Sequence, residues 1–95
     1  MINENLFKAV ETGKADEVAK ALTEEKINAA TYFGAKSIVL TAEQGNREIL
    51  EMLLKNGEKV NRESFWRRTA FGAYGFNKTA LQYAYKCLID VKQYN

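Results

Sequence analysis

Residues 40–61 read LTAEQGNREILEMLLKNGEKVN, and this stretch predicts two helices and the turn between them. A short apolar run ends at Thr41 and Ala42, and Gly45 and Asn46 then break it. After the break, apolar residues recur at the spacing of a helix that is buried along one side. These residues are Ile49, Leu50, Leu53 and Leu54.

Gly57 follows the last of these apolar residues. We expect it to adopt the left-handed backbone conformation that ends many helices, because glycine has no Cβ to clash there. Lys55 lies in the expected last turn, where a cation interacts favourably with the helix dipole. Both signals predict that the second helix ends just before Gly57.

This stretch resembles the ankyrin repeat, with the best match over residues 34–61. The family pattern is A-A-x-x-G-N-x-E-I-V-x-L-L-L-x-x-G-A-D-V-N. The residues of this chain that match it are Thr41-Ala42, Gly45-Asn46, Glu48-Ile49-Leu50, Met52-Leu53-Leu54, Gly57 and Val60-Asn61. The resemblance implies an all-α solenoid of stacked helix-turn-helix pairs linked by extended fingers. It also implies a concave wall that binds other proteins, with no catalytic chemistry of its own.

A spacing of 33 residues connects this stretch to the rest of the chain. Lys26-Ile27-Asn28 recurs as Lys59-Val60-Asn61, and Thr31-Tyr32-Phe33 recurs as Ser64-Phe65-Trp66. We therefore expect extended fingers at residues 27–34 and 60–67. The same spacing predicts one domain over residues 1–95, with three repeats at about residues 1–28, 29–61 and 62–95.

The first repeat contains its own helix signals. Asn3 is an expected N-cap, and the helix after it should end at Gly13. A second helix should follow from about Lys14. The first repeat is therefore expected to contain a hairpin like that of residues 40–61.

The third repeat can be aligned in two registers. In the favoured one, its first helix covers residues 69–76 and its second begins near Thr79. The inward residues of that second helix would be Leu81, Ala84, Tyr85, Leu88 and Val91. In the rival register, residues 79–84 open the repeat, the second finger carries an insertion, and the last repeat is truncated.

Composition indicates a globular chain, because 46% of the residues are hydrophobic and 27% are charged. We expect a soluble cytoplasmic protein without a membrane segment, since no apolar run is long enough to span a bilayer. Cys87 is the one cysteine and histidine is absent, which excludes an internal disulfide. We expect Cys87 to be a small buried hydrophobe, and we expect no cofactor, no metal site and no enzymatic activity.

Charge and aromatic residues are unevenly distributed along the chain. Residues 1–61 contain 8 basic and 10 acidic groups, whereas residues 62–95 contain 6 basic and 2 acidic groups. Residues 62–95 also contain eight of the eleven aromatic side chains. This asymmetry predicts two surfaces with different roles.

The candidate partner-binding residues are four finger-tip aromatics and two arginines beside them: Tyr32, Phe33, Phe65, Trp66, Arg67 and Arg68. Aromatic side chains and arginine dominate interface energetics, and arginine binds carboxylates in a forked geometry. The expected partner is therefore another protein, one with an acidic surface. Alternatively, the aromatics fold onto the stack and extend its core, and the arginines form a solvated face.

The sequence thus predicts a protein-protein interaction module that inhibits or modulates its partner. The rival hypothesis is a nucleic-acid-binding protein that uses its basic, aromatic C-terminal third. Self-association through exposed aromatics is a further alternative.

Overall fold

The computed structural model describes residues 1–57, 60–69 and 76–93, without the side chains of Arg62, Arg67, Lys92 and Gln93. Over these residues the chain forms helices α1 (Glu4–Glu11), α2 (Ala15–Glu24), α3 (Tyr32–Glu43), α4 (Arg47–Lys55), α5 (Arg62–Thr69) and α6 (Lys78–Gln93). The expected all-α class is confirmed for this part of the chain. None of these helices combines the length and apolar character needed to cross a membrane.

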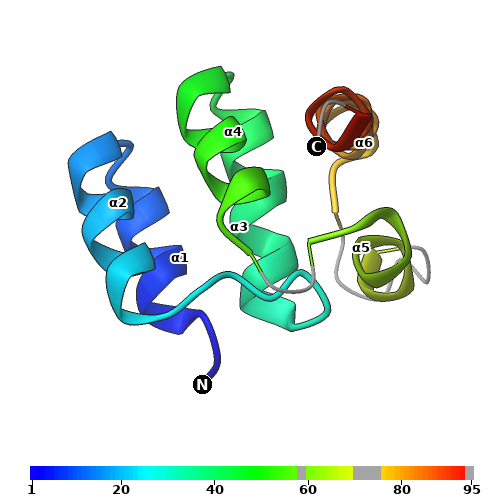
Figure 1. The fold of residues 1–95 in the computed structure, drawn as a ribbon. Coiled ribbons are helices and arrows are strands. Elements are labelled where there is room, and N and C mark those ends of the chain that lie inside the picture. The colour runs from blue at the N-terminus through cyan, green and yellow to red at the C-terminus, as the bar shows by residue number, and fades with distance from the viewer. Residues whose placement is uncertain (58–59, 70–75, 94–95) are drawn as a thin grey trace.

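The first four helices form two hairpins that lie side by side (Figure 1). α1 packs against α3, and α2 packs against α4. Gly13 and Gly45, in the turns of the two hairpins, have φ angles of 71° and 68°. A residue with a side chain would be strained in this left-handed region. The expected helix ends at these two glycines are therefore confirmed.

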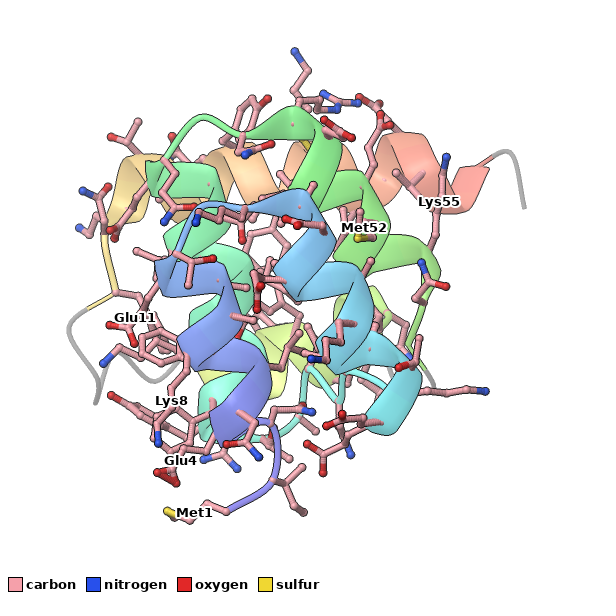
Figure 2. The ribbon with its side chains drawn as sticks, turned by 90° about the vertical axis from the view of Figure 1, so that its left-hand side faces the viewer. Met1, Glu4, Lys8, Glu11, Met52 and Lys55 are labelled. Carbon is pink, nitrogen blue, oxygen red and sulfur yellow. The ribbon has the colours of Figure 1, made fainter. Side chains whose placement is uncertain are left out.

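The C-terminal helix α6 runs across the two hairpins instead of alongside them. Figure 1 shows α6 nearly end-on while α3 and α4 are seen from the side, and Figure 2 shows α6 crossing behind them. α6 packs against both α3 and α4, and α5 packs against α3 and α6. α3 therefore contacts four other helices, which explains why its sequence is apolar around most of its circumference.

The core contains the apolar stripe that the sequence predicts for α4. Ile49, Leu50, Leu53 and Leu54 are all fully buried. On α6, the expected inward residues Ala84, Leu88 and Val91 are buried, and Leu81 and Tyr85 are partly buried. Cys87 is a buried free thiol, as expected.

The first expected finger is non-helical over residues 27–31 but becomes helical at Tyr32, and the second is helical from Arg62 onward, so the expectation of extended structure is wrong for residues 32–34 and 62–67. α3 begins at Tyr32, because the side chain of Thr31 caps the helix by accepting a hydrogen bond from the backbone N–H of Gly34 at 3.1 Å. At α5, Asn61 Oδ1 accepts from the Ser64 backbone N–H at 2.8 Å, and Ser64 Oγ accepts from the Asn61 N–H at 3.3 Å. This reciprocal cap starts a helix inside the segment expected to be extended.

Gly57 follows the end of α4 as expected, but for a different reason. Its φ is not positive, so the expected left-handed conformation is absent. Instead Gly57 forms an isolated parallel bridge with Ile27. A Cβ at position 57 would lie 2.8 Å from Ile27 Cγ2 and 2.9 Å from the Ile27 carbonyl oxygen. Gly57 therefore allows the segments that follow α2 and α4 to approach each other closely.

Asn3 lies at the N-cap position of α1, but its side chain does not cap the helix. It is fully buried, and its amide nitrogen donates to Glu25 Oε1 and to the Lys26 carbonyl, each at 3.1 Å. Its Oδ1 accepts from the Asn28 backbone N–H at 2.7 Å. Asn3 thus connects the start of α1 to the segment that leaves α2.

The two registers considered for the third repeat differ over residues 69–84. Thr69 is the last residue of α5, and residues 70–75 of the expected first helix lie outside the described residues. The expected second helix is present as α6, beginning at Lys78. The Asn77 side chain caps it by accepting from the Ala80 backbone N–H at 3.0 Å.

Candidate functional site

The first candidate site is an aromatic cluster between α5 and α6, made of Phe65, Trp66 and Tyr85, here called the α5 cluster. The ring centroids of Phe65 and Tyr85 are 4.9 Å apart, and those of Trp66 and Tyr85 are 6.0 Å apart. Thr69 Oγ1 donates to the Phe65 carbonyl at 2.8 Å, so the Tyr85 hydroxyl is the donor in its own 2.8 Å contact with that oxygen. Tyr85 is therefore held in a fixed position beneath Trp66.

The two adjacent aromatics of α5 have opposite environments. Phe65 is 1% exposed, whereas Trp66 is 58% exposed. Neighbouring residues on a helix point in different directions, so one can pack in the core while the next faces solvent. The prediction that Phe65 contacts a partner is wrong because its ring is in the core. Trp66 remains available on the surface.

The two arginines of the predicted site follow Trp66 on α5. The Arg68 Nε donates to the carbonyl oxygen of Ala30 at 2.8 Å, and this side chain is half-buried. Arg68 therefore connects α5 to the segment that precedes α3. The Arg67 side chain lies outside the described part of the structure.

The second candidate site is formed by Phe7, Tyr32, Phe33 and Lys36, here called the α1–α3 cluster. Tyr32 and Phe33 lie in the first turn of α3, and their ring centroids are 5.1 Å apart. The Phe33 ring also contacts the Phe7 ring of α1, at 5.5 Å. All four side chains are partly exposed. The expected pairing of Tyr32 with Phe33 is present, but on a helix and not at a finger tip.

The ammonium group of Lys36 lies among these rings. Its Nζ is 5.1 Å from the Phe7 ring centre and 5.2 Å from the Tyr32 ring centre. It also donates to the Tyr32 hydroxyl at 3.0 Å. Sequence reasoning missed Phe7 and Lys36. The four-residue spacing from Tyr32 to Lys36 predicts that these two side chains meet on one face of a helix. No local pattern in the sequence predicts that Phe7 of α1 joins them.

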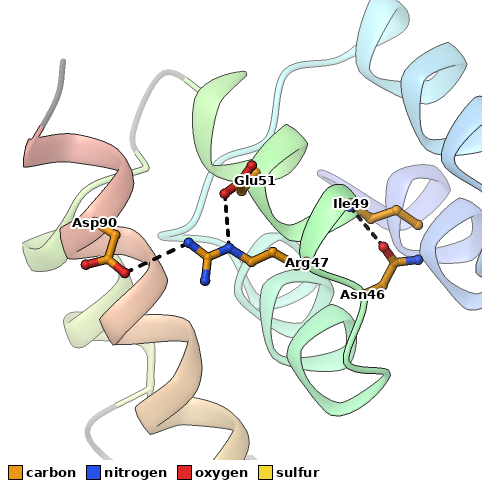
Figure 3. Close-up of polar contacts among 5 residues, drawn as sticks. All are labelled: Asn46, Arg47, Ile49, Glu51 and Asp90. Carbon is orange, nitrogen blue, oxygen red and sulfur yellow. Dashed lines mark hydrogen bonds and ion pairs between the residues drawn. The ribbon is translucent and has the colours of Figure 1, made fainter.

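A polar contact between α4 and α6 is centred on Arg47 (Figure 3). Arg47 Nε is 3.0 Å from Glu51 Oε1, and its Nη2 is 3.9 Å from Asp90 Oδ2. A hydrogen bond with Tyr83, and then the one with Glu51, raise the pKa of Arg47 above its usual value. These groups are well exposed, so the contact positions α6 on α4 but contributes little free energy.

Among the described residues, no group of three or more His, Cys, Asp or Glu side chains could hold a metal ion. A groove of about 560 Å³ lies between the α3–α4 turn and the start of α6. Its described lining residues are Ala42, Glu43, Gly45, Asn77, Thr79, Ala80 and Tyr83, and among these Glu43 is the one carboxylate. This lining contains no pair of carboxylates for acid–base chemistry.

The structure divides the predicted site between the two clusters. Tyr32 and Phe33 lie in the α1–α3 cluster, and Trp66 lies in the α5 cluster. A scan against family models, a search of curated proteins and a search of solved structures each find no match for this chain.

Proposed function

We propose that this chain is a protein-binding module that uses Trp66 as an anchor and modulates its partner in the cytoplasm. Its free thiol, Cys87, suits the reducing conditions of that compartment. In this proposal the architecture is ankyrin-like, with two stacked hairpins and a C-terminal cap formed by α5 and α6.

The packing of the first four helices supports the ankyrin-like part of the proposal. Successive hairpins lie side by side, with first helix against first helix and second against second. The sequence motif of residues 40–61 corresponds to most of the second hairpin. Terminal units of repeat stacks usually depart from the internal pattern to close the core. The crosswise α6 would have this capping role.

The exposure of Trp66 is the observation on which the binding proposal depends. More than half of this large apolar side chain faces solvent, and it packs beside a tyrosine that is itself fixed by Thr69. Tryptophan is among the residues most enriched at the energetic centres of interfaces. A rigidly supported tryptophan loses little conformational freedom when a partner covers it. Trp66 therefore has the properties of a pre-positioned anchor.

The test compares the wild type with Trp66→Ala and with a matched control, Ile89→Ala. Ile89 lies on α6 and is 49% exposed, so the control removes a similarly exposed apolar side chain elsewhere. Each tagged protein is used to retain proteins from native lysate, which mass spectrometry then identifies. We expect a partner that the wild type and the control retain and Trp66→Ala loses, with melting temperatures nearly equal.

Retention of the same proteins by all three variants would contradict the proposal. Trp66 is the one tryptophan in the chain, so its fluorescence gives a second readout. Titration with the purified partner should shift the emission to shorter wavelength, because binding removes the indole from water.

Nucleic-acid binding is the second candidate function. The same exposed indole lies in the chain segment with 6 basic and 2 acidic residues, and aromatic stacking beside positive charge is how many proteins bind single strands. This candidate predicts that a single-stranded oligonucleotide quenches Trp66 fluorescence at low salt, and that added salt reverses the effect. No quenching at low salt would exclude it.

A further inference from the structure

In the α1–α3 cluster two aromatic rings already hold an ammonium group, and the place that this group occupies is here called the pocket. Lys36 Nζ lies over the rings of both Phe7 and Tyr32, at 5.1 and 5.2 Å from their centres. Phe33 contacts both of those rings. The faces of aromatic rings carry partial negative charge and attract cations. The occupant of this pocket is the chain's own lysine.

Two ring faces and the Tyr32 hydroxyl, and not an opposite charge, hold this ammonium group. Among the described residues, no carboxylate lies within ion-pair distance of Lys36. Glu4 and Glu11 lie on α1 one turn before and one turn after Phe7, and Lys8 lies between them along the same edge (Figure 2). The Met1 ammonium group lies 3.7 Å from Glu4 Oε2, so this edge carries two acidic and two basic groups and is close to neutral.

We propose that this pocket binds a methylated lysine side chain of a partner protein, which displaces Lys36. The present occupant shows that a lysine stem and its terminal nitrogen can reach the rings from α3. An unmodified lysine from another chain would compete poorly, because Lys36 is tethered and has a high effective concentration. A quaternary ammonium makes larger contact with ring faces and suits aromatic cages.

This site is separate from Trp66, and the proposal does not depend on the proposed function of the α5 cluster. Lys36 acts as an internal competitor that must leave before a ligand enters. The apparent affinity is therefore reduced by the fraction of molecules in which the pocket is open. Removing the Lys36 side chain should raise that fraction.

The test uses N-acetyl-trimethyl-lysine methylamide as the probe and follows its N-methyl protons by NMR. Protons held over ring faces resonate upfield, so bound probe should show an upfield shift with the wild type at high protein concentration. Lys36→Ala should bind the probe more tightly than the wild type, by roughly 3- to 30-fold. The factor is modest because the two cation–π contacts that hold Lys36 in place are offset by the conformational entropy that its side chain loses there. Phe7→Leu in the Lys36→Ala background should remove most of this gain.

Lys8→Ala is the matched control, because it removes the same charge from the adjacent edge without opening the pocket. The proposal is overturned if neither wild type nor Lys36→Ala shifts the probe, or if Lys8→Ala gives the same gain. Equal binding of unmethylated lysine amide, or tighter binding of phosphocholine than of the methylated lysine probe, would also overturn it. Trp66→Ala should leave probe binding unchanged, which separates this result from the outcome for the α5 cluster.

Discussion

Replacing Asn3 with alanine should be among the most destabilising single changes outside the apolar core. The Asn3 side chain is fully buried and makes three hydrogen bonds of 3.1 Å or less, with Glu25, Lys26 and Asn28, besides a longer contact of 3.4 Å with the Thr31 hydroxyl. Alanine would remove all three and leave the Asn28 N–H and the Lys26 carbonyl without these partners. Asn3 also has a φ of 64°, a region that asparagine tolerates better than alanine.

The size of the effect follows from these two terms. Each intramolecular hydrogen bond contributes about 1 kcal/mol net, so the three bonds together contribute about 3 kcal/mol. The left-handed backbone adds about 1 kcal/mol for alanine. We therefore expect Asn3→Ala to lower the free energy of unfolding by about 4 kcal/mol, from a total of roughly 5 to 15 kcal/mol for a domain of this kind.

Urea unfolding followed by circular dichroism measures this change. Asn5→Ala is the matched control, because Asn5 lies on the same helix and is exposed, and its loss should change stability by less than about 0.5 kcal/mol. Asn3→Gly separates the two terms, since glycine adopts the left-handed conformation freely; it should be less destabilising than Asn3→Ala by up to about 1 kcal/mol. A loss below about 1 kcal/mol for Asn3→Ala would refute the reasoning, because it would mean that the buried bonds contribute almost nothing net.

Two further predictions concern the core and a close backbone contact, and the same urea experiment measures both. Leu53→Ala should lower the free energy of unfolding by about 2 to 5 kcal/mol, because Leu53 is fully buried in α4. Met52→Ala should lower it clearly less, because Met52 is partly exposed. Equal losses for the two variants would contradict the assigned burial. Gly34→Ala should destabilise by about 1 to 3 kcal/mol, although helix propensity alone predicts a gain of about 1 kcal/mol. The added Cβ would lie 2.7 Å from the Asn28 carbonyl carbon and from Thr31 Oγ1, so a stabilised variant would show that this approach can relax.

The sequence was sufficient to predict the elements whose signals are local. The glycine turns at Gly13 and Gly45 and the apolar stripe of α4 follow from backbone sterics and helical spacing, and the structure contains all of them. The burial of Cys87 was also predictable, because the chain has no histidine to activate this thiol and no second cysteine to pair with it.

The helix starts inside the two expected fingers were missed because a 33-residue spacing compares residue types and ignores how helices start. Thr31 and Asn61 both cap helices, yet they are 30 residues apart and not 33. Tyr32 therefore lies in a first turn, whereas Phe65 lies a turn deeper and faces the core. The reciprocal Asn61 and Ser64 pair was a readable signal for α5.

The two clusters could not be assembled from the sequence, because each joins helices that are distant along the chain. Phe7 meets Phe33 through the packing of α1 on α3, and Tyr85 meets Trp66 through the packing of α6 on α5. No periodicity within one helix specifies such contacts. They depend on how the helices cross, and the direction of α6 is not encoded in its own apolar stripe.

The position of α6 has a consequence for the order in which the protein can fold during synthesis. α6 is one of the helices that cover α3, but it leaves the ribosome after the other five described helices. Until then α3 must keep an apolar side exposed, or cover it with something else in the cell. The nascent chain is therefore a candidate client for chaperones that bind apolar surface during this interval.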